Sequence, residues 1–291
     1  MSTTPLAPGE YRLDVGGAVI ALHCTPAGFA EGLARWFDRP SAAAAPHVRL
    51  DIELVPHADD PRLPTSLVTT KRVAADGSFD IADGLVRGRF DAATGRGQLR
   101  VKQVLAHGNL VRIFEQLLYQ AFRDARRLAG WDGFLLHSSA VIAHGKGFVF
   151  VGPSGAGKST VARLSAGHHV LGDEMNLLRR RPDGWQVVGT PFNGLFRAKR
   201  PGEAPLAAVF LLRQAPRHAL AEAPPLAAAT TIAAEIAPPV GLAEAPDAGT
   251  LPAMLDMAAE LVGQTSLKFL DFLPDEGFWR RIGEVYGFPD A

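Results

Sequence analysis

The sequence predicts an α/β fold in which a domain with a central sheet and flanking helices follows a small α+β domain. Three observations predict it. Residues 131–291 alternate between short apolar runs typical of buried strands and segments with helical periodicity, and residues 1–130 carry mainly strand and turn signals. A glycine-rich loop at 152–157 stands between an apolar strand and a helix. Hydrophobic residues make up 47% of the 291 residues, enough to bury a core in each domain.

Residues 1–130 are expected to form the α+β domain. Thr25-Pro26 is a good cap and first-turn pair for a helix, and residues 47–55 alternate between apolar and polar as a strand does. In order, we expect two strands around Gly16-Gly17 (11–22), a helix carrying Phe29, Leu33, Trp36 and Phe37, a strand (47–55), a meander (77–102) and a strong amphipathic helix (112–129) that ends before Gly130. Nothing here has a catalytic pattern, so we expect this half to pack, to dock a partner or to support assembly.

Residues 131–291 are expected to form the second domain. In order, the patterns predict strand runs (134–143 and 147–151), a helix (159–165), a strand (170–175), a hairpin turn at Pro182-Asp183-Gly184, a strand (207–212), a helix (226–236), a second helix (252–262), a strand (267–272) and a closing helix (276–286). The Ala- and Pro-rich stretch 214–250 is expected to cross the surface around its helix. Phe278 and Trp279 are expected in the core.

Composition excludes several classes of function. Thirty basic residues balance thirty acidic ones, whereas a general nucleic-acid binder needs a basic footprint. Cys24 is the single cysteine, so neither an intrachain disulfide nor a cysteine-based metal site can form. The first residues lack the pattern of a signal peptide, and no apolar run reaches the length of a membrane span. We therefore expect a cytoplasmic protein that does not bind a membrane.

The strongest motif lies in the second domain. Gly152-Pro153-Ser154-Gly155-Ala156-Gly157-Lys158-Ser159 satisfies G-x-x-x-x-G-K-[ST], the pattern of a phosphate-binding P-loop, and Thr160 follows it. The apolar strand 148–151 precedes the motif and a helix is expected after it, which is the context that the motif requires. The sequence therefore predicts a nucleotide-binding site over 152–160.

Each part of this motif has a physical purpose. Glycines let the backbone bend until its N–H groups surround a phosphate, and the start of the following helix favours negative charge. Lys158 supplies a mobile positive charge for the β- and γ-phosphates of ATP, and the Ser159 hydroxyl is placed to hold Mg²⁺. The cofactors expected are ATP and Mg²⁺.

Two flanking segments carry further candidates. Upstream, His137 is expected at the start of a strand that pairs near the phosphate strand. Downstream, the adjacent acids Asp173 and Glu174 follow a strand shortly after Lys158, whereas the Mg²⁺-associated acid of most P-loop proteins comes much later. A carboxylate within reach of an acceptor hydroxyl would assist its attack on a γ-phosphate.

This order of histidine, P-loop and acidic pair resembles the catalytic domain of the HPr kinase/phosphorylase family of P-loop serine kinases. The segment Val188-Gly189-Thr190-Pro191-Phe192-Asn193-Gly194 resembles a G-T-P-aromatic-x-G segment of HprK-related kinases, and 267–279 resembles their ending. The resemblance covers about residues 131–285. It implies a P-loop kinase domain of the HPr kinase type, which transfers a phosphoryl group to a serine hydroxyl of a protein or peptide.

The resemblance also implies roles for individual residues. Asp173 would be the general base, Glu174 would help to hold Mg²⁺, and His137 would contact and tune the base. Members of the family form hexamers, which implies a homo-oligomer. Two departures, Asp-Glu in place of two aspartates and Lys158-Ser159-Thr160 at the end of the loop, leave the acceptor open.

Two alternatives remain from the sequence, a kinase for a small molecule and a regulator that senses ATP without transfer. The motif N-K-x-D of guanine-specific GTPases and the L-S-G-G-Q signature of transport ATPases are both absent from the chain. Among the other polar residues, the basic group Arg197, Lys199 and Arg200 is either a phosphate clamp or a solvated loop. The run 179–181 is expected as a solvated hairpin tip, and His168 and His169 are expected on the surface.

Overall fold

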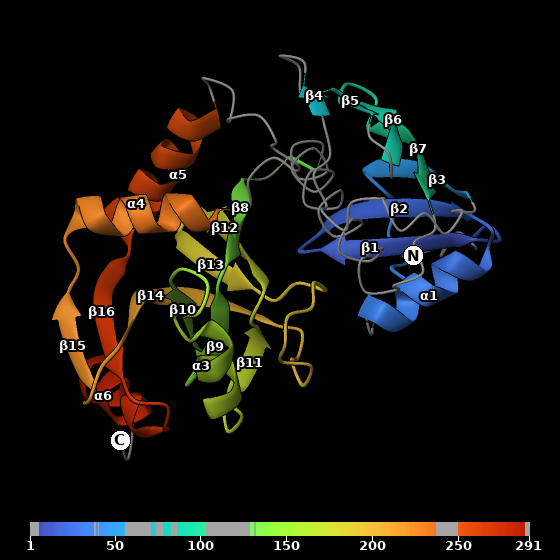
Figure 1. The fold of residues 1–291 in the computed structure, drawn as a ribbon. Helices are drawn as coiled ribbons and strands as arrows, with labels where there is room; N and C mark the ends of the chain where they lie inside the picture. Colours follow the sequence, from blue (N-terminus) through green and yellow to red (C-terminus); the bar gives the residue numbers. More distant parts are fainter. Residues whose placement is uncertain are drawn as a thin grey trace, which may run out of the picture. The chain divides into compact units, whose positions relative to one another are not determined.

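The structure is a computed structural model, which describes residues 6–37, 39, 41–55, 71–73, 78–82, 86–102, 129–130, 132–236 and 250–288. Within these residues the fold is α/β, with mixed β-sheets and five helices (Figure 1). The α/β prediction is thereby confirmed. The chain divides into two compact units, one of the described residues up to 130 and one of 132–236 and 250–288.

The first unit is built on a seven-stranded sheet in the order β1-β2-β3-β7-β6-β5-β4. Its strands are β1 (Glu10–Val15), β2 (Ala18–Thr25), β3 (Val48–Val55), β4 (Lys71–Val73), β5 (Phe79–Ala82), β6 (Val86–Asp91) and β7 (Arg96–Lys102). Strand β3 runs parallel to β2 and β7, and the other pairs are antiparallel. The predicted strands are present. Strand β4 was not predicted, because three residues are too few to show a periodicity.

One helix of the first unit, α1 (Gly28–Phe37), packs against β1 and β2 (Figure 1). It buries Leu33 and Phe37, and the ring of Phe37 stacks on Tyr11 with centroids 6.2 Å apart. Residues 112–128 of the predicted helix lie outside the described residues, so that prediction stays open.

The second unit is built on a nine-stranded sheet. Its strands are β8 (Gly133–His137), β9 (Ser139–Ala143), β10 (Lys146–Val151), β11 (His169–Gly172), β12 (Met175–Arg181), β13 (Gly184–Val188), β14 (Glu203–Gln214), β15 (Ala219–Glu222) and β16 (Ser266–Phe272). The order is β11-β9-β10-β14-β13-β12-β8, and β16 pairs with β14 and β15. Strand β14 runs parallel to both β10 and β16.

Helices cover both faces of this sheet (Figure 1). Because side chains alternate along a strand, β10 serves two cores. Phe148 and Phe150 pack with α3 (Lys158–Leu164) and α6 (Gly277–Tyr286), whereas Val149 and Val151 pack with α4 (Pro225–Glu235) and α5 (Thr250–Gln264). The expected helices are present, and Phe278 and Trp279 lie in the core as predicted.

Two strands predicted as continuous are each divided. The run 134–143 breaks at Ser138, since β8 pairs with β12 whereas β9 pairs with β10 and β11. His137 therefore ends a strand and does not begin one, and that strand does not pair with β10. The run 170–175 breaks likewise at Asp173 and Glu174, between β11 and β12. The backbone N–H of Ser138 donates to the carbonyl of Glu174 at 2.9 Å, so the two breaks lie side by side.

The remaining differences concern polar segments. The hairpin turn after β12 is present, but Arg179 is buried and pairs with Glu203, so 179–181 is not wholly a solvated tip. Strand β15 was not predicted within the Ala- and Pro-rich stretch, whose residues 237–249 lie outside the described part. In the described ranges, no helix is long and apolar enough to cross a membrane.

Candidate functional site

The glycine-rich loop (152–157) lies at one edge of the second sheet. It follows β10 and leads into α3, so the strand, loop and helix come in the order that the motif requires. Strands β10, β14 and β16 are parallel, and their carboxyl ends meet at this edge, where ligands of α/β folds commonly bind. The amide of Gln214, the last residue of β14, donates to the carbonyl of Gly155 at 2.9 Å.

Two glycines of this loop have conformations that other residues avoid. Gly155 has φ +82° and Gly157 has φ +113°. A Cβ on Gly157 would lie 2.6 Å from Cζ of Phe272, the last residue of β16. Glycine at 157 is therefore required for two reasons, the positive φ angle of the backbone and the close approach of the Phe272 ring.

Lys158 turns back into the loop that precedes it. Its side chain is buried, and Nζ donates to the carbonyl of Gly152 at 2.5 Å and to that of Pro153 at 3.4 Å. The ammonium group thus lies within the loop. Ser159 and Thr160 follow in the first turn of α3 and are partly exposed.

Asp173 lies against the end of the segment 189–194. Its Oδ2 accepts backbone N–H groups of Leu195 and Phe196 at 3.1 and 3.0 Å, and its side chain is buried. Its Oδ1 is also buried and has no hydrogen-bond partner. A buried carboxylate oxygen without a donor is costly, so Oδ1 is an unsatisfied acceptor in this structure. Neighbouring Glu174 is half-buried.

Other contacts hold the segment 189–194 in place. The hydroxyl of Thr190 donates to the carbonyl of Met175, directly after the acidic pair. The ammonium of Lys199 donates to the carbonyls of Thr190 and Phe192. Within the basic group 197–200, Lys199 therefore supports the segment, and Arg200 donates to the carbonyl of His168 at 2.8 Å. The segment singled out in the sequence and Asp173 lie together.

His137 is joined to a residue that the sequence analysis did not single out. Its Nδ1 lies 2.8 Å from Oε2 of Glu235, and the same oxygen lies 3.5 Å from Nζ of Lys158. Among the described residues, no hydrogen bond or ion pair joins His137 to Asp173. The structure thus brings His137 and Lys158 together through Glu235, and holds Asp173 in a separate set of contacts. One signal was present, because Glu235 is the single ionisable residue of the segment PLAAATTIAAE that forms α4.

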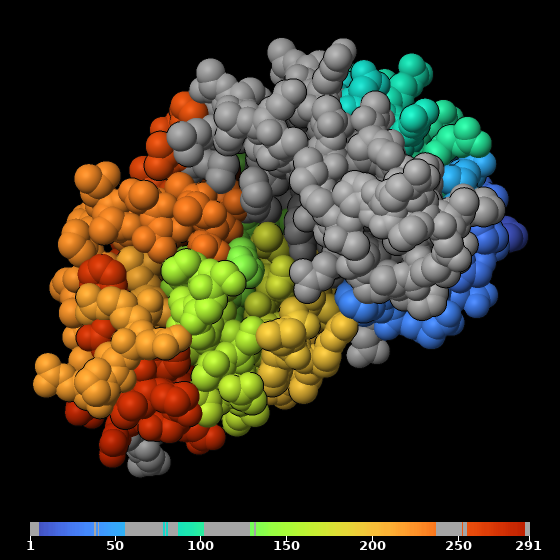
Figure 2. Space-filling model, in the orientation of Figure 1, coloured from blue at the N-terminus to red at the C-terminus, as the bar shows by residue number. Residues whose placement is uncertain are grey.

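The end of α4 therefore borders the loop. In Figure 2 the orange surface of α4 adjoins the light green surface of the loop and α3. The described residues contain no group of three or more His, Cys, Asp or Glu side chains able to hold a metal ion. A metal ion at this site would therefore have few protein ligands. Mg²⁺ commonly binds with one or two protein oxygens together with phosphates and water, and Ser159 and Glu174 carry oxygen donors of the right kind.

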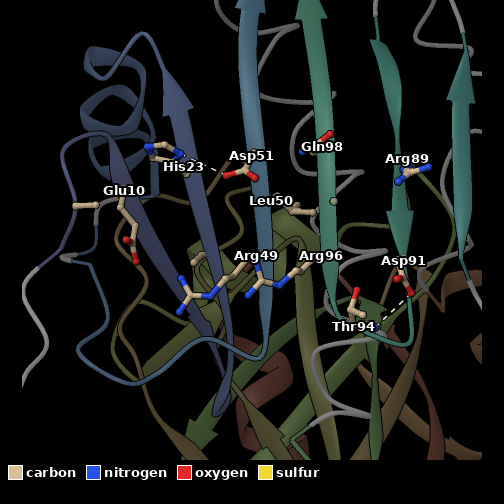
Figure 3. Close-up of a pocket in the computed structure, with 13 residues that line it drawn as sticks. Glu10, His23, Arg49, Leu50, Asp51, Arg89, Asp91, Thr94, Arg96 and Gln98 are labelled. Carbon is tan, nitrogen blue, oxygen red and sulfur yellow. Dashed lines mark hydrogen bonds and ion pairs between the residues drawn. The ribbon is translucent and has the colours of Figure 1, made fainter.

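The first unit carries a separate polar hollow of about 500 Å³ on the exposed face of its sheet (Figure 3). An arginine and an acid follow each other at alternate positions of one strand there, as with Arg49 and Asp51 on β3, and His23 lies 3.3 Å from Asp51. The charged lining consists of Glu10, Arg49, Asp51, Arg89, Asp91 and Arg96. Because the two signs nearly balance, this face has the character of a solvated sheet surface.

One family is similar to this chain. The model of the family described as SynChlorMet cassette protein ScmC matches residues 102–240. That range is slightly under half of the chain, and it contains the glycine-rich loop, Asp173 and Glu235. The description of that family names no activity. No curated protein is significantly similar to the chain.

Proposed function

We propose that this protein is a kinase of the HPr kinase type that uses ATP and Mg²⁺ to phosphorylate a serine hydroxyl of a protein or peptide. The observation that carries the proposal is the position of Lys158. Its ammonium group lies inside a loop that has the P-loop sequence, between a buried strand and a helix, at the carboxyl edge of parallel strands.

Binding of ATP would use the loop first. Lys158 exchanges the carbonyls of Gly152 and Pro153 for phosphate oxygens, and the loop N–H groups surround the phosphates. Ser159 and Glu174 would hold Mg²⁺, which when bound neutralises charge on the phosphates. Gly155 and Gly157 allow the positive φ angles of the loop, and Gly157 also leaves room for the ring of Phe272.

Asp173 is the base in this proposal. The serine oxygen of the acceptor attacks the γ-phosphorus, the bond from that phosphorus to the β–γ bridging oxygen breaks, and ADP leaves. The proton of the acceptor hydroxyl passes to Oδ1 of Asp173, the oxygen that has no partner, while Oδ2 stays held by Leu195 and Phe196. Since Asp173 is 3% exposed, the segment 189–194 has to open to admit an acceptor.

The experiment is transfer of label from [γ-³²P]ATP in the presence of Mg²⁺ and lysate of the host organism. We expect label on a discrete protein or peptide with the wild-type protein and none with Lys158→Ala. Arg163→Ala is the matched control, because Arg163 is an exposed cation on the same helix, α3. Label in small molecules would favour a small-molecule kinase, ATP bound without turnover would favour an ATP-sensing regulator, and equal ATP binding by Lys158→Ala would refute the site.

A further inference from the structure

Glu235 occupies a position that is costly for a carboxylate. It is the last residue of α4, where the negative end of the helix dipole disfavours an acid. Only 13% of its side chain is exposed. A carboxylate that is largely withdrawn from water needs compensating partners, and Glu235 has two cationic or potentially cationic neighbours.

Both neighbours contact the same oxygen. Oε2 of Glu235 lies 2.8 Å from Nδ1 of His137 and 3.5 Å from Nζ of Lys158. The backbone fixes this arrangement, because Ile236 forms an isolated antiparallel bridge with Leu136 next to His137. The end of α4 is thus tied to the end of β8, beside the start of α3.

The contact with His137 determines which ring nitrogen carries the proton. A carboxylate accepts but does not donate, so Nδ1 has to carry a hydrogen, and in the neutral imidazole Nε2 is then left as an acceptor. Carboxylates orient histidines in this way in many sites. The contact with Lys158 has a different effect, because it adds a third protein oxygen to the two carbonyls that hold the ammonium group in the loop.

We propose that Glu235 is a positioning residue of the nucleotide site, which fixes the tautomer of His137 and competes with nucleotide phosphate for Lys158. The competition rests on the proposed function, since it requires Lys158 to bind phosphate. When Lys158 binds a phosphate instead, Glu235 keeps only its contact with His137. Through Glu235, phosphate binding in the loop is therefore coupled to His137.

Two substitutions separate the charge of Glu235 from its hydrogen bond. Glu235→Gln removes the charge but keeps an oxygen that accepts from Nδ1, whereas Glu235→Ala removes both. Glu284→Gln is the matched control, because Glu284 lies on the helix α6, is half-exposed and pairs with Arg281. Thermal unfolding of all variants checks that they fold.

The first readout is affinity for ATP without Mg²⁺, measured by calorimetry on the full chain. Removing a competing carboxylate should tighten ATP binding about two- to fivefold in both Glu235 variants, the range of a modest ion pair, and leave Glu284→Gln unchanged. If Glu235 only supported the structure, its loss would weaken ATP binding. Weaker or unchanged ATP affinity in Glu235→Gln would therefore overturn the proposed competition for Lys158.

The second readout is the tautomer of His137, from ¹⁵N chemical shifts of histidine-labelled protein without nucleotide, assigned with His137→Gln. We expect the Nδ1–H form in the wild type and in Glu235→Gln, and a shift to the Nε2–H form in Glu235→Ala. The Nε2–H form in the wild type would overturn the role for His137. This measurement needs no ATP. If the wild type binds no ATP, the proposed function fails, and so does the proposed competition between Glu235 and phosphate. The tautomer of His137 then still tests whether Glu235 accepts a hydrogen bond from Nδ1 of His137.

Discussion

Gly194 lies so close to Asp173 that a Cβ on Gly194 would come within 2.3 Å of Oδ1 and 2.8 Å of Cγ of the carboxyl group. No real Cβ tolerates such a contact, so an added methyl group has to displace the segment or the acid. The glycine that ends the segment 189–194 is therefore what allows the backbone to close over Asp173.

The first prediction concerns that glycine. Gly194→Ala should shift the segment away from Asp173, lower stability by about 1–3 kcal/mol and reduce phosphoryl transfer strongly, with ATP affinity retained. Gly167→Ala is the control, because a Cβ there meets nothing within 4 Å. Urea unfolding and transfer assays measure the two effects, and full activity of Gly194→Ala would contradict the assigned role of the segment.

The second prediction concerns the loop. Gly157→Ala should abolish ATP binding and cost about 1–3 kcal/mol, since alanine is strained at φ +113° and its methyl group would meet the ring of Phe272. Gly263→Ala serves as the control, because it lies in α5 with open space around it and should be neutral or slightly stabilising. Calorimetric titration with ATP and urea unfolding distinguish these outcomes.

The third prediction separates binding from transfer at Asp173. Asp173→Asn keeps one oxygen to accept the N–H groups of Leu195 and Phe196 but cannot take a proton, so ATP affinity and melting temperature should stay near wild type. Transfer should fall about a hundredfold or more, as expected for loss of a general base. Single-turnover assays with ATP and the labelled acceptor measure the rate of phosphoryl transfer. Wild-type transfer would exclude Asp173 as the base.

The fourth prediction concerns the support of α3. The indole N–H of Trp279 on α6 donates to the hydroxyl of buried Ser165, directly after α3, at 2.9 Å. Ser165→Ala leaves that donor without an acceptor and should cost about 1–3 kcal/mol. Because Trp279→Phe removes the same bond, the double variant should lose less than the sum of the single losses in urea unfolding. Strict additivity would show that the bond contributes nothing.

The fifth prediction is a loss of stability in alkali. Burial raises the pKa of Cys24 from 9.0 to about 12 and that of Tyr11 from 10.0 to about 12. The folded first unit thus keeps protons that the unfolded chain releases. This stabilisation is complete below the unfolded pKa values and is lost as pH rises towards the folded ones. Urea midpoints should fall between about pH 9 and 12, and less steeply for Cys24→Ala. Equal slopes would contradict a raised thiol pKa.

Local structure was largely predictable from the sequence. The strand, loop and helix at 147–165 show clear signals in the local sequence, as do the helix over Gly28–Phe37 and the hairpin after Arg181. Apolar periodicity and glycine spacing report such short-range order. They do not report which strands become neighbours, so the break at Ser138 was missed.

The candidate site was predictable only in part for the same reason. Asp173 and the segment that closes on it were singled out, but Glu235 reaches Lys158 from 77 positions away, through packing of α4 on the sheet. No local sequence pattern predicts such a contact. The only sign of it in the sequence is that Glu235 is the single acidic residue of an alanine-rich helix, and such residues are also common on protein surfaces.

The bond between Ser165 and Trp279 also bears on how the protein is made. The two residues stand 114 positions apart, and synthesis at roughly 5–20 residues per second separates their appearance by on the order of ten seconds. During that interval the nascent loop lacks both the ring of Phe272 beneath it and the helix that fastens α3. The glycine-rich loop therefore cannot reach its final packing while the ribosome is still adding β16 and α6.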